Sequence, residues 1–380
     1  MQQERLHKFL LWTLALLVAS VFLCFSDYKS TSNDSNYYST LVVRYADKTL
    51  PEILTAKWGE NFWSFDPNTF MRDQLPGQLL IGIALTKVGV PARHALHLAG
   101  MFFLLGGIFL IRAIISHFDK AKADYVFVGL FLCSLTFSYT IRANHEPAIF
   151  FFSTLALYSG LKIQQTKWAV LHAVLSPLFL MWVKGPFLIF GFFLFTLGFL
   201  LSGQQSKKYF LWFSTNAIAA LLLLISGIAF EMKFKQLTGD SFFNVFWNIQ
   251  MGERVHATEH FFLLQKYLNF QYYFLHYLGY ALPWILFALY SAFWIKRERL
   301  VQFLKSDPSL VLGSAALVYL LVFSASNRIA GRYVFPGYYY FTAWIFLLMY
   351  ERFKKAPGSM MTHYLAAALW ITAVFLRLKT

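Results

Sequence analysis

Several charged side chains lie at the ends of long apolar stretches of the sequence. Arg142 and Glu146 are four residues apart in a short turn, and Lys184 stands alone between two apolar runs, in Lys-Gly-Pro. Ionisable side chains this close to hydrocarbon are costly and commonly mark a functional site. Guanidinium groups bind phosphate through two hydrogen bonds, and an ammonium group holds it as a point charge. We therefore expect a phosphate-bearing ligand held by some of Arg142, Lys184, Arg254, Arg328 and Arg332.

Two of these cations, Arg142 and Lys184, also have a structural interpretation. Arg142 and Glu146 could close one helical turn as an ion pair, and Lys184 could extend its ammonium group to the membrane interface. Arg328 and Arg332, again four residues apart, would share one face of a helix, which suits a single phosphate.

Three acidic residues are candidates for a general base, namely Asp34, Asp73 and Glu146. A base must lie within hydrogen-bond reach of the hydroxyl that it deprotonates, and it must be ionised until it takes the proton. Asp34 opens an amphipathic segment, where it could equally cap a helix. Asp73 precedes a Pro-Gly turn, and Glu146 lies near the start of the next helix.

The ten histidines include no HExxH motif and no compact Cys/His cluster. His256 and His260 lie four residues apart, but a catalytic metal normally needs three protein ligands. A divalent ion between Asp34 and Glu146 stays open as an alternative, although two ligands are too few to assert it, and no other cofactor is expected. The residues expected to position the acceptor or substrate are Tyr37, Tyr38, Arg72, His145 and His260.

The elements that position these residues are transmembrane helices. The chain is 58% hydrophobic and only 13% charged, against roughly 25% charged residues in a soluble domain. About 20 apolar residues cross a bilayer as a helix, and in lipid a helix satisfies its own backbone. We expect one all-α transmembrane domain over 1–380, with about eleven helices and no carboxyl-terminal soluble domain. The runs that lack Asp, Glu, Lys and Arg include 9–26, 125–141, 186–206, 209–230, 267–295 and 333–350.

The distribution of basic residues predicts the orientation in the membrane. Clusters at 5–8, 120–122, 162–167, 207–208, 296–299 and 352–355 fall at every second membrane exit, as cytoplasmic loops do. The amino terminus is then cytoplasmic, and the long segments 27–77 and 231–266 are outer loops. The candidate site residues all fall on the outer side. A net charge of +15 therefore indicates an anionic ligand there, and nucleic acid is excluded as a partner.

In its motifs and their order, the sequence resembles the GT-C superfamily of polytopic glycosyltransferases, especially the aminoarabinose-transferase and protein O-mannosyltransferase-like branch. The resemblance covers nearly the whole membrane core. The motifs that carry it are Asp34 with Tyr37-Tyr38, Asp73-Gln74-Leu75-Pro76, Arg142 with Glu146 before the helix 151–158, Lys184-Gly185-Pro186, Arg254 with His260, Pro283-Trp284, and Arg328 and Arg332 leading to Tyr333-Val334-Phe335-Pro336.

This resemblance implies an enzyme of the bacterial cell envelope. It would be a multi-pass inner-membrane glycosyltransferase, with its active site on the periplasmic side. It would move a sugar from a polyprenyl-phosphate donor to a lipid, glycan or protein acceptor, with inversion at the anomeric carbon. The sequence departs from the family where Gln74 replaces a lysine that contacts the donor phosphate, and where Ser35 replaces the second acid of an Asp-Glu pair.

Two other functions are compatible with the same basic outer face. One is a flippase or transporter of anionic lipids or lipid-linked sugars, whose fold usually shows inverted repeats. The other is a non-catalytic subunit of a membrane assembly. The acidic first outer loop, with seven of the 18 acidic residues of the chain, argues against both.

Overall fold

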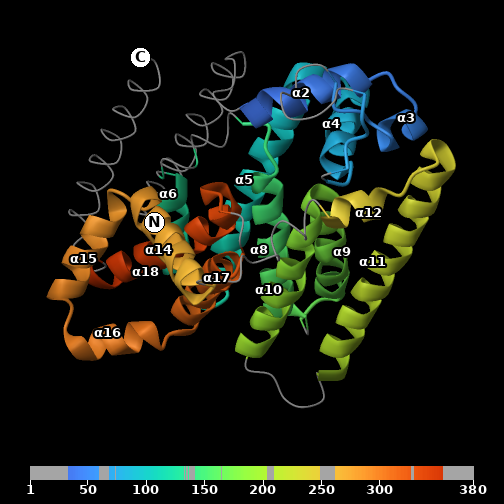
Figure 1. Ribbon diagram of the computed structural model, residues 1–380. Helices are drawn as coiled ribbons and strands as arrows, with labels where there is room; N and C mark the ends of the chain where they lie inside the picture. Colours follow the sequence, from blue (N-terminus) through green and yellow to red (C-terminus); the bar gives the residue numbers. More distant parts are fainter. Residues whose placement is uncertain are drawn as a thin grey trace, which may run out of the picture.

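The structure, a computed structural model, describes residues 33–59, 68–72, 74–131, 133, 136, 142–163, 165–202, 209–248, 262–326 and 329–353 (Figure 1). Within them the chain forms helices and no strand beyond an isolated bridge between Lys57 and Phe70. The helices are α2 (Asn33–Tyr45), α3 (Leu50–Leu54), α4 (Gly77–Lys87), α5 (Ala92–Ser116), α6 (Lys120–Phe131), α8 (Glu146–Lys162), α9 (Lys167–Lys184), η1 (Gly185–Phe187), α10 (Leu188–Leu201), α11 (Tyr209–Thr238), α12 (Phe242–Trp247), α14 (Phe262–Tyr280), α15 (Trp284–Trp294), α16 (Arg297–Leu304), α17 (Asp307–Ser324), η4 (Gly331–Val334) and α18 (Phe335–Phe353).

The expected all-α membrane architecture is confirmed. In the described part of the chain, four helical stretches are long and apolar enough to cross a membrane, or five if the bent pair α14–α15 counts as one span. The four are Ala92–Ser116, Lys167–Leu201, Tyr209–Thr238 and Asp307–Ser324. The expected count of about eleven stays a prediction, because the apolar run 9–26 and the last segment lie outside the described residues. The single domain and its two outer loops also stay predictions.

Helix α8 lies at the centre of the bundle, packed against α5, α9 and α10. Its contact with α10 depends on Gly160 and Gly198, which face each other's backbones. A Cβ atom at Gly160 would lie 2.2 Å from the carbonyl oxygen of Phe195. Small residues allow helices to approach closely where the hydrophobic effect between them is weak, so these two glycines fix the central helix pair.

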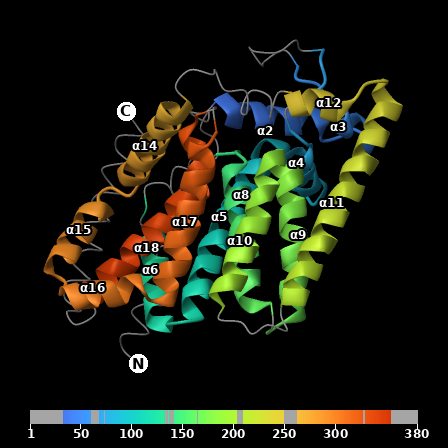
Figure 2. The same cartoon turned by 60° about the horizontal axis from the view of Figure 1, so that its bottom comes forward.

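The Lys-Gly-Pro sequence forms the reversal between α9 and α10. Gly185 has a φ of +46°, which a residue with a Cβ rarely adopts, and Pro186 opens the short helix η1. Gly191 then packs against Pro177 across the pair. Lys184 is thereby held at the end of α9, on the side of the bundle where α2 and α12 also lie (Figure 2).

The segment that precedes α4 supplies a helix that lies across this end of the bundle. The amphipathic segment that begins near Asp34 is α2, whose apolar face packs on α4 and α5 through residues such as Leu41 and Val42. The Ser35 hydroxyl accepts a hydrogen bond from the backbone amide of Ala143. This bond ties the start of α2, and with it Asp34, to the turn that precedes α8.

Candidate functional site

Three segments that are far apart in sequence meet at this end of the bundle. Arg332, in η4, forms an ion pair with Asp34 at the start of α2. Its Nε atom also lies 3.9 Å from the Oε1 atom of Glu146, the first residue of α8. One guanidinium group therefore bridges two carboxylates, which are two of the three residues expected to supply a base.

A small polar cavity surrounds this arrangement, and we refer to it as the polar site. Its free volume is about 10 Å³, room for about one water molecule. Two basic and two acidic side chains contribute to it. The lining residues are Asp34, Tyr38, Asn144, His145, Glu146, Ile149, Lys184, Phe187, Arg332 and Tyr333.

Three consecutive residues of the polar site are buried and carry atoms without a hydrogen-bond partner among the described residues. The atoms are Oδ1 of Asn144, Nε2 of His145 and Oε2 of Glu146. A buried polar atom left without a partner costs about 1–3 kcal/mol. Three such atoms in one turn, next to one cavity, indicate a place where a ligand or an ordered water can bind.

Burial also sets the protonation of His145. The pKa of its imidazole lies well below the usual value, first because the ring is buried and second because the positive charge of Lys184 is near. His145 is therefore neutral at pH 7. Its unpartnered nitrogen can then accept a hydrogen bond, or donate one, without adding a third cation to the site.

Lys184 is oriented by Gln74, which lies just before α4. Its Nζ atom donates to Oε1 of Gln74 over 2.9 Å, and the Tyr38 hydroxyl donates to the same oxygen over 3.4 Å. The Tyr38 ring also meets the edge of the His145 ring, with centroids 4.5 Å apart. Gln74, which replaces the lysine usual in the resembled family, thus acts as an acceptor that holds the remaining lysine in place.

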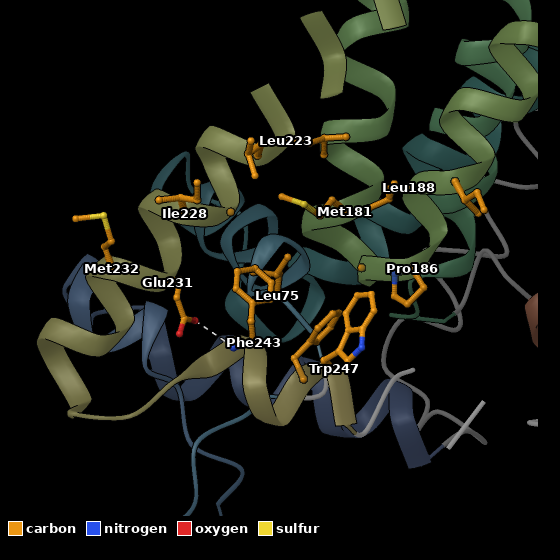
Figure 3. A pocket seen from close by; sticks show the side chains of 15 residues that line it. Leu75, Met181, Pro186, Leu188, Leu223, Ile228, Glu231, Met232, Phe243 and Trp247 are labelled. Atoms are coloured by element: carbon orange, nitrogen blue, oxygen red, sulfur yellow. Dashed lines mark hydrogen bonds between the residues drawn. The ribbon is translucent and has the colours of Figure 1, made fainter. Parts of the chain in front are cut away.

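An apolar groove of about 600 Å³ (Figure 3) shares the short helix η1 with the polar site, because Gly185 and Pro186 line the groove and Phe187 lines the polar site. Its walls come from α9, η1, α10, α11 and α12, with Met181, Leu223 and Phe243 among the lining residues. Gly185, next to Lys184, is part of the same wall. The one acidic residue of the lining, Glu231, turns toward α12, where it accepts hydrogen bonds from the amides of Phe242 and Phe243. The groove is therefore almost wholly apolar, and it adjoins the residue that follows Lys184.

The structure brings six of the expected site residues together and places two others elsewhere. Asp34, Tyr38, His145, Glu146, Lys184 and Arg332 line the polar site. Tyr37 is buried, and its hydroxyl donates to the carbonyl oxygen of Trp58. Arg72 is paired with Asp240 at 2.7 Å, in the turn between α11 and α12.

Arg142 lies in the turn before α8, within electrostatic reach of Glu146. The remaining candidates, Asp73, Arg254, His260 and Arg328, lie outside the described residues. Within the described residues no group of three His, Cys, Asp or Glu side chains could hold a metal ion. Arg332 contacts both carboxylates of the polar site and so supplies a positive charge between them.

Asn144 and Gln74 are site residues that sequence reasoning did not single out. Asn144 lies inside the Arg142–Glu146 turn, so its place next to two candidate residues was a usable signal. Gln74 had a weaker one, since only the departure from the family pattern drew attention to it.

Comparison with known proteins supports the fold. No family model and no curated protein matches the sequence. Among solved structures, the crystal structure of ArnT from Cupriavidus metallidurans in the apo state is similar, with a TM-score of 0.59 at 14% sequence identity. The match covers 89% of this chain and 59% of ArnT, so the chain spans well under two thirds of that protein. The fold of this chain is thus similar to that of ArnT, in agreement with the resemblance that the sequence motifs indicate.

Proposed function

We propose that this chain is a membrane glycosyltransferase that transfers a sugar from a polyprenyl-phosphate donor to an acceptor. The observation that carries the proposal is the junction at Lys184 and Gly185, where a polar site with two cations and two carboxylates meets a 600 Å³ apolar groove. A donor with a hydrocarbon tail and a phosphate head matches both parts. The GT-C-like fold supports the same reaction class.

In the proposed reaction, the polyprenyl tail occupies the groove and the phosphate lies against Lys184 and Arg332. The acceptor oxygen attacks the anomeric carbon, and the bond between that carbon and the phosphate oxygen breaks. The electron pair leaves with polyprenyl phosphate, whose developing charge the two cations stabilise. Because Arg332 bridges Asp34 and Glu146 in the structure, a bound phosphate would share this guanidinium group with the carboxylates.

A carboxylate of the polar site takes the proton of the acceptor hydroxyl. Asp34 is the better candidate, because 29% of its side chain is exposed against 10% for Glu146. Attack on the face opposite the leaving phosphate gives inversion. A divalent ion held by Asp34 and Glu146 would take the place that Arg332 occupies, and activity after chelation of divalent ions tests for it.

The location follows from the same proposal. The polar site lies on the periplasmic side of the inner membrane, and the amino terminus is cytoplasmic. The acceptor is a lipid, a glycan or a protein of the cell envelope.

The test measures release of free polyprenyl phosphate by the purified protein, with a panel of polyprenyl-phosphate sugars and membrane extract as acceptor. We expect wild-type turnover that collapses in Asp34→Asn. The matched control is Asp47→Asn, because the Asp47 side chain is fully exposed and lies outside the polar site. No release from any donor would contradict the proposal and favour the flippase, which a lipid-translocation assay in vesicles would then test.

A further inference from the structure

A stripe of polar side chains runs along one edge of α14, and the proposed function leaves it unused. Gln265, Asn269, Tyr272, His276 and Tyr280 recur at intervals of three or four residues, which places them on one side of the helix. With α15, α14 forms a bent pair apolar enough to cross the membrane. Polar side chains on a membrane-spanning helix are costly and mark binding or transport sites.

The first two residues of the stripe, Gln265 and Asn269, have a structural role. Gln265 donates to Asn269, and Asn269 donates over 2.6 Å to the carbonyl oxygen of Ser326, just after α17. Asn269 is completely buried. These two residues therefore fix α14 against α17 through hydrogen bonds within the protein.

The last three residues of the stripe are Tyr272, His276 and Tyr280. They form an aromatic edge that is only partly buried. The rings of Tyr272 and His276 are 4.1 Å apart between centroids, and Tyr280 packs on Tyr338 at 4.6 Å. In the described part of the chain, the Tyr272 and Tyr280 hydroxyls form no hydrogen bond. The edge thus presents flat apolar faces together with hydroxyl groups that can still bond to a ligand.

The hydrogen bonding of His276 leaves its second nitrogen as an acceptor. Nδ1 lies 2.8 Å from the carbonyl oxygen of Tyr272, and a carbonyl can only accept, so Nδ1 carries the proton. In the neutral imidazole, Nε2 is then a hydrogen-bond acceptor. This nitrogen faces Gly331, where a Cβ atom would lie 3.0 Å away.

The aromatic edge lies next to the polar site, on the side opposite to the groove. Gly331, against which His276 packs, directly precedes Arg332. The charge of Arg142 acts on the Tyr280 hydroxyl as well as on Glu146. Both views place α14 on the far side of the bundle from α11 and α12, which line the groove (Figures 1 and 2). If the donor lipid occupies the groove, the aromatic edge is on the acceptor side.

We propose that Tyr272, His276 and Tyr280 bind a carbohydrate acceptor. Aromatic rings pack on the apolar face of a pyranose, while Nε2 of His276 and the tyrosine hydroxyls bond to sugar hydroxyl groups. This inference rests on the proposed function and deepens it, since it selects a sugar-bearing acceptor over a protein side chain or a simple lipid. His276 is a positioning residue in this arrangement, and the proton still goes to a carboxylate of the polar site.

The test is direct binding of methyl pyranosides and disaccharides to the purified full chain, measured by saturation-transfer NMR without donor. We expect millimolar binding by wild type, weakened about tenfold in Tyr280→Leu and in His276→Ala. Phe274→Leu is the matched control, because Phe274 is on the same helix, 40% exposed, and outside the stripe. Tyr272→Phe, which removes only a hydroxyl, serves if a larger change prevents folding.

Two results would overturn this inference: no sugar binding by wild type, or equal binding by all variants. Polyprenyl phosphate release, measured separately, keeps the two proposals apart. Sugar binding without release of polyprenyl phosphate contradicts the proposed transferase and supports the carbohydrate site. Release of polyprenyl phosphate without sugar binding supports the transferase and contradicts the carbohydrate site. In the transfer assay, Tyr280→Leu should raise the acceptor KM about tenfold and leave the donor KM unchanged.

Discussion

The two ends of the helical bundle carry ion pairs of similar composition. They differ in whether the buried polar atoms around those pairs have hydrogen-bond partners among the described residues. At the end opposite to the polar site, Arg112 binds Asp124 through two nitrogens, at 2.8 and 2.6 Å. Lys122 binds Glu351 at 2.7 Å, which ties α6 to α18. These contacts join neighbouring helices and leave no buried side-chain atom without a partner in this cluster, as far as the structure describes it.

At the polar-site end, the ion pair of Arg332 with Asp34 lies beside buried atoms of Asn144, His145 and Glu146 that lack a hydrogen-bond partner among the described residues. An ion pair near the membrane boundary is therefore not by itself a sign of function. Unsatisfied buried acceptors beside the pair distinguish a site that awaits a ligand from one that holds helices together. Matched substitutions at the two ends test this distinction.

The largest effect should come from the carboxylates. Asp34→Asn should lower the rate of sugar transfer by 100-fold or more, within the range of about 10² to 10⁴ for loss of a general base. Glu146→Gln should lower it less if Asp34 is the base. Rates are measured as polyprenyl phosphate release at saturating donor.

Asp124→Asn is the matched change at the opposite end. It breaks the pair with Arg112, so it should lower the melting temperature while the rate per folded molecule stays within about twofold of wild type. A loss of rate in Asp124→Asn as large as in Asp34→Asn would remove the distinction between the two ends.

Lys184→Met should have the next largest effect, with a loss of about 100-fold in kcat, as for other groups that stabilise charge in a transition state. The Gln74 side chain keeps the hydrogen bond from Tyr38, and Met keeps the apolar volume along α9. Lys87→Met is the control, since Lys87 is exposed at the end of α4 and forms only a 4.0 Å contact with Asp47. Equal kcat values in the two variants would exclude a phosphate contact for Lys184.

The sequence predicted the helices better than it predicted the contacts between them. The uncharged runs and the amphipathic period of α2 are local patterns, so the all-α membrane fold and the position of α2 could be anticipated. The Lys-Gly-Pro turn was equally local, because a glycine and a proline suffice to reverse the chain there.

The contacts of the site depend on tertiary structure. Tyr37 and Tyr38 are adjacent and identical in type, yet one is buried against Trp58 and the other lines the polar site, because neighbouring residues on a helix point about 100° apart. The bond between Lys184 and Gln74 joins residues 110 positions apart, and no local pattern reports it. The apolar groove is likewise invisible in the sequence, since its lining residues resemble any other membrane-facing residues.

A smaller effect is expected from filling the groove. A Cβ atom at Gly227 of α11 would lie at an ordinary distance of 3.7 Å from Phe243, so Gly227→Ala should be tolerated. Gly227→Phe should place a ring among the groove residues and raise the KM of a long-chain donor about tenfold. That change corresponds to about 1.4 kcal/mol, or the burial of roughly two methylene groups. A short-chain donor should show no difference between the two variants, and an equal rise for both donors would argue that the tail binds elsewhere.

The smallest effect concerns pH. Burial holds the pKa of His145 well below its ordinary value, so the folded protein keeps the imidazole neutral while the unfolded chain protonates it near pH 6.5. The contribution of His145 to the free energy of unfolding is therefore fully present above about pH 6.5, and it is lost as the pH falls toward the folded-state pKa. The melting temperature of wild type should drop between pH 7.5 and 5.5, and by less in His145→Gln.

At the opposite end, the pKa of His117 is also lowered by burial and by Lys162, but Asp307 opposes the shift, so His117→Gln should change the pH dependence less. The reverse order of the two variants would mean that the polar site is not the more strongly desolvated end of the bundle.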